Sequence, residues 1–447
     1  MLPAGVALAM LSFTLAGMVV APATSRADEI EGGEIVVPVE PPPPAVAPAA
    51  EEEVRRPCCT LWPLGYFDET VDTIQSFLAD KHITMNSGLS TSFQWDFNDP
   101  SSYKAGLREF SDTHSRYFVD LWQLTLANTP DPEPGDFGGL VQLDAGRHAR
   151  DIKADWNGTG VIPDQQWEFH EFELQQAFVT YNIPIGRGLT LKGGKLNMLV
   201  GVEEFEPWNN ANYSRSFLYD FGQPYTFTGG TLSYPFTDMV ELEAGAAVGW
   251  NNFEDNNDSA SGVGALRLTP NEKFSLKVGG IIGPEQSCDG AGVTLPNGQG
   301  CNSNYRGIVD VVADMQPHDD VNVKLAYLYG SEDEASAVSP GRHATWSGFE
   351  GVIAYDFLDC FTAAVRGEWF QDAQGSRTAA NLDRIGVRPQ RLTLWEVSAD
   401  LKAMLSKHIY VRTEYRHDEA DDDVFLAGKT ILHAGQDTVA FELGYHF

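Results

Sequence analysis

The last twelve residues of the chain, 436–447, constrain the fold more than any other segment. From residue 439 onward every second residue is large and apolar, and the residues between are small or polar. The apolar set is Val439, Phe441, Leu443, Tyr445 and Phe447, and the other set is Ala440, Glu442, Gly444 and His446. A period of two gives a strand one apolar face and one wet face. A transmembrane β-barrel needs such strands, because lipid touches one face and the lumen touches the other.

The amino-terminal segment predicts export. Residues 6–20 are almost continuously apolar, and Ser25 and Ala27 supply small residues for a cleavage site. We therefore expect residues 1–27 to be a secretory signal peptide that is cut before Asp28. No Lys or Arg precedes the apolar run, so the positive region typical of such signals is missing. An uncleaved membrane anchor is the alternative, although the run is short for a spanning helix.

Hydropathy and charge narrow the functional classes. After Ala27 no segment approaches the roughly 20 apolar residues that a spanning helix requires, so an exported chain of this kind is either soluble or a barrel. The formal net charge is −33, from 63 acidic and 30 basic residues. This acidic excess argues against nucleic-acid binding, which needs a basic surface. It suits loops and a lumen that face water.

Residues 83–447 carry a pattern that predicts about sixteen β-strands. In residues 409–416, for example, Ile, Val, Thr and Tyr alternate with Tyr, Arg, Glu and Arg. Tight and long connections alternate from Pro184 onward, as in a barrel with short periplasmic turns and longer outer loops. A soluble β-sandwich with a polar outer face is the alternative. We predict an all-β fold, a transmembrane antiparallel up-and-down β-barrel of about 16 strands, with both termini on the periplasmic side.

Residues 28–82 differ from the strand region and are predicted to lie in the periplasm. Residues 35–50 are rich in proline and precede three consecutive glutamates, 51–53, which indicates an extended, semi-rigid linker. Residues 68–81 place apolar side chains at helical spacing, so they predict one short amphipathic helix. This helix would plug the barrel, lie at its periplasmic mouth, or simply lead into the first strand.

Several short strings in the strand region are familiar in combination. They are FELQQAFVTY at 172–181, GLTLKGGK at 188–195, NYSRS at 212–216, GQPYTFTG at 222–229, GWNN at 249–252, GEWFQD at 367–372 and EYRHD at 414–418. Together they resemble a bacterial family of outer-membrane β-barrel porins, within the porin superfamily. The resemblance covers roughly residues 83–447 and implies the bacterial outer membrane as location, but it does not name a solute. Homotrimers are common among such porins, so a homotrimer is implied by analogy only.

A barrel of about sixteen strands is wide enough to leave an aqueous channel. In sixteen-strand porins the third outer loop folds inward, and here that loop is residues 200–223. Opposed charges at such a constriction would select solutes by size and charge. The loop carries acidic groups and one arginine, and the far wall would supply basic residues with carboxylates among them. The candidate constriction residues are Glu203, Glu204, Glu206, Arg215, Arg366, Glu368, Arg412, Glu414 and Arg416. The loop carboxylates and the acidic excess predict a mild cation preference. An ordinary surface loop, or one that latches a neighbouring subunit, is the alternative.

The cysteines and other reactive residues predict no catalytic or metal site. Cys288 and Cys301 bracket a Gly-rich segment, so we expect a disulfide between them in an oxidising compartment. Cys58, Cys59 and Cys360 leave an odd count without an assigned role. The cysteines are scattered and no His cluster accompanies them, which argues against a metal site. No Gly-x-Ser-x-Gly motif occurs. We therefore expect neither enzymatic activity nor a cofactor.

Two functions remain from the sequence. The first is a porin for passive diffusion of small hydrophilic solutes or ions, surrounded by outer-membrane lipid. The second is an outer-membrane barrel that acts as an adhesin or envelope anchor without significant transport, with the Pro-rich linker reaching the cell wall. The charged residues inside the predicted strands favour the first.

Overall fold

The computed structural model describes residues 64–128, 135–152, 171–286 and 303–447. The predicted signal peptide, the Pro-rich linker and four of the five cysteines (Cys58, Cys59, Cys288 and Cys301) lie outside these described residues. The signal peptide and the Cys288–Cys301 disulfide therefore stay predictions. Cys360 lies in the described part of the chain and takes part in a disulfide bond.

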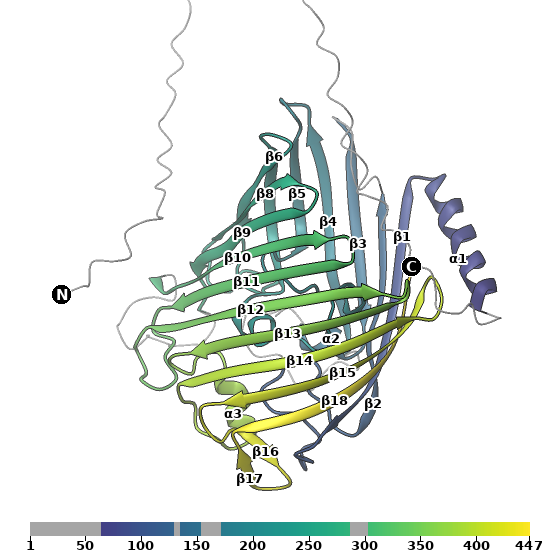
Figure 1. Cartoon of the computed structure of the whole chain (residues 1–447). Coiled ribbons are helices and arrows are strands. Elements are labelled where there is room, and N and C mark those ends of the chain that lie inside the picture. The colour runs from purple at the N-terminus through teal and green to yellow at the C-terminus, as the bar shows by residue number, and fades with distance from the viewer. Residues whose placement is uncertain (1–63, 129–134, 153–170, 287–302) are drawn as a thin grey trace, which may run out of the picture. The chain divides into compact units, whose positions relative to one another are not determined.

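The described residues form a closed barrel of 16 antiparallel strands, which confirms the predicted fold class (Figure 1). In the order around the ring the strands are β1 (Ile83–Asp96), β18 (Gly435–His446), β15 (Ile409–Ala420), β14 (Leu392–Met404), β13 (Phe361–Asp372), β12 (Ala344–Phe357), β11 (Val321–Glu332), β10 (Tyr305–His318), β9 (Phe274–Pro284), β8 (Ser261–Asn271), β7 (Val240–Ala247), β6 (Thr226–Pro235), β5 (Leu189–Asn197), β4 (Phe172–Ile183), β3 (Phe137–Ala145) and β2 (Arg116–Asn128). The last strand closes the ring on the first, with Phe441 paired to Phe93. No strand edge of the ring is therefore left open to lipid.

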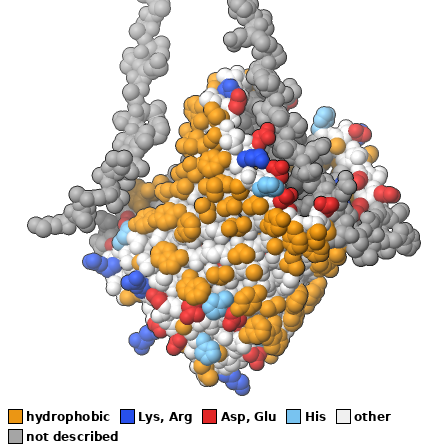
Figure 2. Space-filling model, viewed as in Figure 1, with side chains coloured by type: hydrophobic (Ala, Val, Ile, Leu, Met, Phe, Trp, Pro, Cys, Tyr) orange, Lys and Arg blue, Asp and Glu red, His pale blue; other side chains and the backbone are white. Residues whose placement is uncertain are grey.

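Side chains alternate between the two faces of the barrel wall as the sequence predicts. In β18, Phe441 and Leu443 are 56% and 48% exposed, whereas Glu442 between them is 3% exposed. In β15, Tyr415 points outward and Arg416 is fully buried inside. Figure 2 shows hydrophobic side chains spread over the outer surface of the strands nearest the viewer. The apolar outer face suits hydrocarbon, and the buried charged side chains of β15 and β18 point to the interior.

Connections at the two ends of the barrel differ in length. Short turns join β8 to β9 at 272–273, β10 to β11 at 319–320 and β12 to β13 at 358–360. Long segments leave the other end at 198–225, 373–391 and 421–434. The last of these carries a separate two-stranded sheet, β16 (Phe425–Ala427) and β17 (Ile431–His433). Short helices lie in other long segments: α2 (Arg147–Asp151), η1 (Pro207–Asn209), η2 (Leu218–Gly222) and α3 (Ala379–Arg384).

Helix α1 (Leu64–Ala79) precedes the barrel and overlaps most of the predicted helical segment. The Ser406 hydroxyl donates a hydrogen bond to Asp68 at 3.1 Å, and the Lys407 ammonium group donates one to Asp72 at 2.6 Å. Both partners belong to the short turn between β14 and β15, so the helix is held at the rim of the barrel and leads into β1. Within the described ranges, no helix is long and apolar enough to span a bilayer.

Candidate functional site

The long segment between β5 and β6, residues 198–225, runs across the inside of the barrel, and we call it the inner loop. The Gly201 amide donates a hydrogen bond to Asp310 of β10 at 2.7 Å. The Tyr213 hydroxyl lies 2.7 Å from the Ser92 hydroxyl of β1. Strands β1 and β10 lie nearly opposite one another in the ring. The inner loop therefore reaches both sides of the lumen.

Two glutamates of the barrel wall hold the backbone of the inner loop. The Phe217 amide donates to one carboxylate oxygen of Glu368 at 2.6 Å, and the Leu218 amide donates to the other at 2.5 Å. Glu414 accepts hydrogen bonds from the Tyr213 amide at 3.1 Å and the Ser214 amide at 3.2 Å. These amides have no helix or sheet partner at this point, so the wall carboxylates satisfy them instead.

Three arginines of the wall hold carbonyl groups of the same loop. Arg366 of β13 donates to the Ser214 carbonyl at 2.6 Å, and Arg412 of β15 donates to the Asn210 carbonyl at 2.8 Å. Arg416 of β15 donates to the Arg215 carbonyl. All three guanidinium groups are buried. They were expected to face an open lumen across from the loop, but they lie beneath it, because its carbonyls approach this wall directly.

The predicted acidic residues of the loop fall into different environments. Glu203 pairs with Arg366 at 2.8 Å and is buried. Glu204 is exposed inside the barrel. Glu206 accepts hydrogen bonds from the amides of Gln123 and Gln142, each at 3.0 Å, and burial raises the pKa of its carboxyl group above the usual value. The three neighbouring glutamates are therefore not equivalent.

Arg215, also a candidate, does not reach the open lumen. Its side chain is 1% exposed and donates to the Phe205 carbonyl at 2.8 Å. The guanidinium group also lies over the Tyr219 ring, 5.5 Å from its centroid. These contacts are all within the inner loop, so Arg215 stabilises the loop's own fold.

Glycines in the wall leave room for large side chains of the inner loop. A Cβ atom added at Gly88 of β1 would overlap the Trp208 ring, and one added at Gly348 of β12 would overlap the Leu218 side chain. Two loop side chains therefore pack into slots that exist only because the wall lacks a side chain there.

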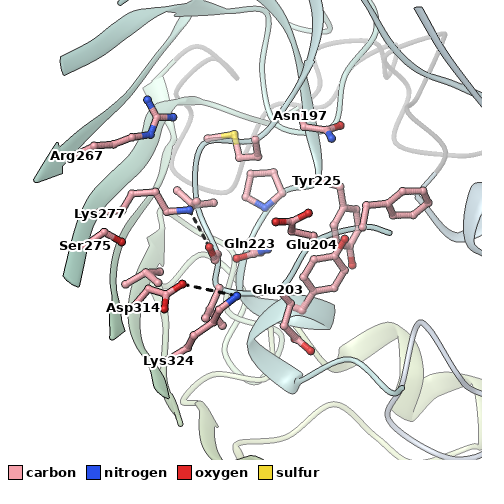
Figure 3. A pocket seen from close by; sticks show the side chains of 18 of the residues that line it. Asn197, Glu203, Glu204, Gln223, Tyr225, Arg267, Ser275, Lys277, Asp314 and Lys324 are labelled. Atoms are coloured by element: carbon pink, nitrogen blue, oxygen red, sulfur yellow. Dashed lines mark hydrogen bonds and ion pairs between the residues drawn. The ribbon is translucent and has the colours of Figure 1, made fainter. Parts of the chain in front are cut away.

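A cavity of about 440 Å³ separates the inner loop from strands β8 to β11 (Figure 3). Its wall side carries three basic residues and one acidic residue, Arg267, Lys277, Lys324 and Asp314, and its loop side carries Glu203, Glu204 and Glu206. Lys277 and Lys324 were not among the predicted constriction residues, although each lies between apolar residues in an alternating strand sequence. Arg267 was missed altogether, although it also occupies an inward position of its strand, opposite Lys277.

A second outer loop, residues 97–115, also folds inward. Arg108 pairs with Asp418 of β15 at 2.5 Å, and both side chains are buried. The Glu109 amide donates a hydrogen bond to Asp220 of the inner loop at 3.1 Å. This loop and the inner loop pack together over the side of the lumen near β15 and β18. The open space therefore lies off centre, against β8 to β11.

Nothing in the described ranges suggests a metal site, since no group of three or more His, Cys, Asp or Glu residues there is arranged to hold an ion. Nor does the interior bring a nucleophile, a histidine and a positioning acid together in the contacts described above. The chemistry available to the site is that of fixed charges around a space, which can bind, orient or repel a solute.

Comparisons with known proteins agree with this geometry. A family model described as "Putative beta-barrel porin-2, OmpL-like" matches residues 82–447. No curated protein matches the chain. Among solved structures, OprB of Pseudomonas putida is 12% identical, with 84% of this chain and 97% of that chain covered and a TM-score of 0.54. An anion-selective porin from Comamonas acidovorans is 10% identical, with coverage of 82% and 99% and a TM-score of 0.51. OmpT of Vibrio cholerae in a trimer form is 9% identical, with coverage of 82% and 99% and a TM-score of 0.51. At such identities the structures show a common fold.

Proposed function

Because the chain belongs to the OmpL-like family of outer-membrane β-barrel porins, we propose that it lets small hydrophilic solutes or ions diffuse passively across the outer membrane of a bacterium. The family and the fold are those of a channel rather than an enzyme. The protein resides in the outer membrane, where its apolar outer face contacts lipid.

One observation carries this proposal: the wall is a closed ring of 16 strands with a polar interior. Closure at this strand number gives an interior too wide for side chains of the wall alone to fill. Here two inward loops occupy part of that interior, and a cavity of about 440 Å³ remains beside them. Such a ring supports a water-filled passage. The stability of the fold alone does not require the cavity to stay open, so the cavity favours a role in transport.

The inner loop is proposed to narrow this passage. Its support is the set of contacts to Glu368, Glu414, Arg366, Arg412 and Arg416, which hold the loop inside the barrel instead of above it. On this proposal these five residues of β13 and β15 hold the constriction loop in place and do not themselves contact the solute. The residues that a solute would meet are Glu204 on the loop and the basic residues of β8, β9 and β11.

The expected mild cation preference stays a prediction. The prediction was based on the carboxylates of the loop and on the acidic excess of the chain. The cavity also presents three basic side chains, which reduce any net preference for cations. Reversal potentials in planar bilayers under a salt gradient measure this directly.

Assembly into a homotrimer is a further part of the proposal. Its support is the trimer form of the similarly folded OmpT from Vibrio cholerae. The molecular mass of the detergent-solubilised protein, measured by light scattering with the detergent contribution subtracted, tests it.

Liposome swelling with sugars of graded size tests the transport function. A porin gives swelling rates that fall steadily with solute size. The alternative, an adhesin or envelope anchor with a sealed barrel, gives no size-dependent uptake. A protein-free liposome sample sets the baseline for both outcomes.

A further inference from the structure

The disulfide bond of Cys360 needs a partner from another part of the chain. Cys360 ends the short turn between β12 and β13. It is the one cysteine among the described residues, so its partner lies outside them. The other cysteines are at two places in the sequence, Cys58 and Cys59 ahead of α1, and Cys288 and Cys301 between β9 and β10. The position of Cys360 in the barrel decides between these two places.

The segment between β9 and β10 lies at the wrong end of the barrel. Pro284 and Tyr305 pair where these two strands end, at the rim of the long loops. The β12–β13 turn is at the opposite rim, and the 11 residues of β9 separate the rims by about 25 Å at the usual strand tilt. Cys288 and Cys301 are each four residues from the nearer of these strand ends, a reach of at most about 14 Å. A disulfide adds about 7 Å between Cα atoms, so neither cysteine reaches Cys360.

Helix α1, in contrast, lies at the same rim as Cys360. The Cys360 carbonyl accepts a hydrogen bond from the Met404 amide at 2.9 Å. Cys360, Met404 and Tyr410 form one buried cluster, and the last two residues flank the β14–β15 turn. Ser406 and Lys407 of that turn hold α1, and Figure 1 shows the helix beside it. Cys360 and α1 therefore contact the same short turn.

The chain ahead of α1 is long enough to close the remaining gap. Cys59 is five residues before Leu64, where α1 begins, and five residues reach up to about 18 Å. Asp68 is one helical turn after Leu64, a rise of about 6 Å, and it already accepts a hydrogen bond from Ser406. Cys58 and Cys59 can therefore meet Cys360 without any movement of the helix.

The described contacts of α1 hold it only weakly. From residue 68 to residue 79, where the side chains are described, Val71 is the one buried residue. The pair between Lys407 and Asp72 is 33% and 49% exposed, and ion pairs in water contribute little to stability. A covalent bond would supply the attachment that these contacts lack.

We propose that Cys58 or Cys59 is the partner of Cys360, and that this disulfide fastens the chain ahead of α1 to the periplasmic mouth of the barrel. The bond forms when the two thiols lose two protons and pass two electrons to a disulfide oxidant of the periplasm, which becomes a dithiol. Trp208 of the inner loop packs against the Cys360 cluster. The bond therefore joins the helix segment to the wall where the wall also meets the inner loop. This inference is independent of the proposed transport function.

Peptide mapping of the full-length protein tests the pairing. The protein is purified from outer membranes without reductant, its free thiols are blocked with N-ethylmaleimide, and it is digested with trypsin. The tryptic peptides separate the candidates, because Cys58 and Cys59 fall in residues 56–81, Cys360 in 343–366, and Cys288 and Cys301 in 278–306. We expect mass spectrometry to find 56–81 linked to 343–366, and to lose this species after reduction. A link from 343–366 to 278–306, or N-ethylmaleimide on Cys360, would overturn the assignment.

Serine variants supply the controls. Cys288→Ser should keep the link between 56–81 and 343–366, whereas the double variant Cys58→Ser/Cys59→Ser should abolish it. The fastening role is tested on folded protein by trypsin cleavage after Lys81, which is exposed. The fragment that carries α1 should stay attached to the wild-type barrel until reductant is added, and it should leave Cys360→Ser without reductant. Heat-modifiable migration in SDS gels shows that the barrel of the variant is folded. A fragment that stays on folded Cys360→Ser would contradict the fastening role.

Discussion

The bidentate contact between Glu368 and the inner loop makes a sharp prediction about loop docking. Both carboxylate oxygens accept a backbone N–H, from Phe217 at 2.6 Å and from Leu218 at 2.5 Å. Only an ionised carboxylate offers two acceptor oxygens here. Glu368→Gln keeps the shape of the side chain, but it removes the charge and turns an N–H donor group toward a backbone N–H.

The expected loss follows from the strength of such bonds. A hydrogen bond to a charged group contributes about 1.5–3 kcal/mol, and a buried donor without an acceptor costs a similar amount. Weakening one bond and losing the other should reduce the free energy of loop docking by about 2–4 kcal/mol. This corresponds to a shift of about 30- to 1,000-fold in the equilibrium between docked and released loop.

Single-channel recording in planar bilayers is the assay. We expect Glu368→Gln to add conductance levels above the wild-type level, because a released loop obstructs the passage less. Glu419→Gln is the matched control, since Glu419 sits on the same wall but faces outward and does not touch the inner loop. Heat-modifiable migration in SDS gels shows that each variant has a folded barrel. A folded Glu368→Gln protein whose current traces match those of the wild type would refute the role given to this contact.

Two other predictions concern the same loop. Gly88→Val should destabilise the protein by about 1–3 kcal/mol through overpacking against Trp208. The control Gly367→Val, at a position with open space around it, should not. Urea unfolding followed by tryptophan fluorescence measures both variants, and equal destabilisation would contradict the packing of Trp208 against Gly88. Burial raises the pKa of the Glu206 carboxyl group in the folded protein above its ordinary value of 4.5. The folded protein therefore binds more protons than the unfolded one between pH 4.5 and the raised pKa. Stability should therefore rise as the pH falls through that window, and Glu206→Gln should remove this part of the slope in thermal unfolding measured against pH.

The barrel could be predicted from the sequence because its cause is local. Residues two apart lie on one face of a strand whatever the rest of the chain does. In β18 this alone placed Phe441 outside and Glu442 inside, and the structure agrees. The alternation of short and long connections then fixed the up-and-down order, since an antiparallel ring returns to the same rim after every second strand.

The details of the site were harder to predict, because they depend on contacts between distant segments. The sequence marked residues 200–223 as an inward loop only through counting strands and a family resemblance. It could not show that Arg366, Arg412 and Arg416 bind loop carbonyls, because backbone groups leave no signature in the sequence. The pairing of Arg267 with Lys277 depends on strand register, which periodicity does not determine across two separate strands.

The conductance of single wild-type molecules in a planar bilayer tests the central claim most directly. If water fills a lumen inside the closed ring, the purified protein should insert and give discrete current steps. The size of these steps should rise in proportion to salt concentration in the dilute range. Folded protein that inserts into the bilayer but leaves the current at the level of the bare membrane would contradict the account.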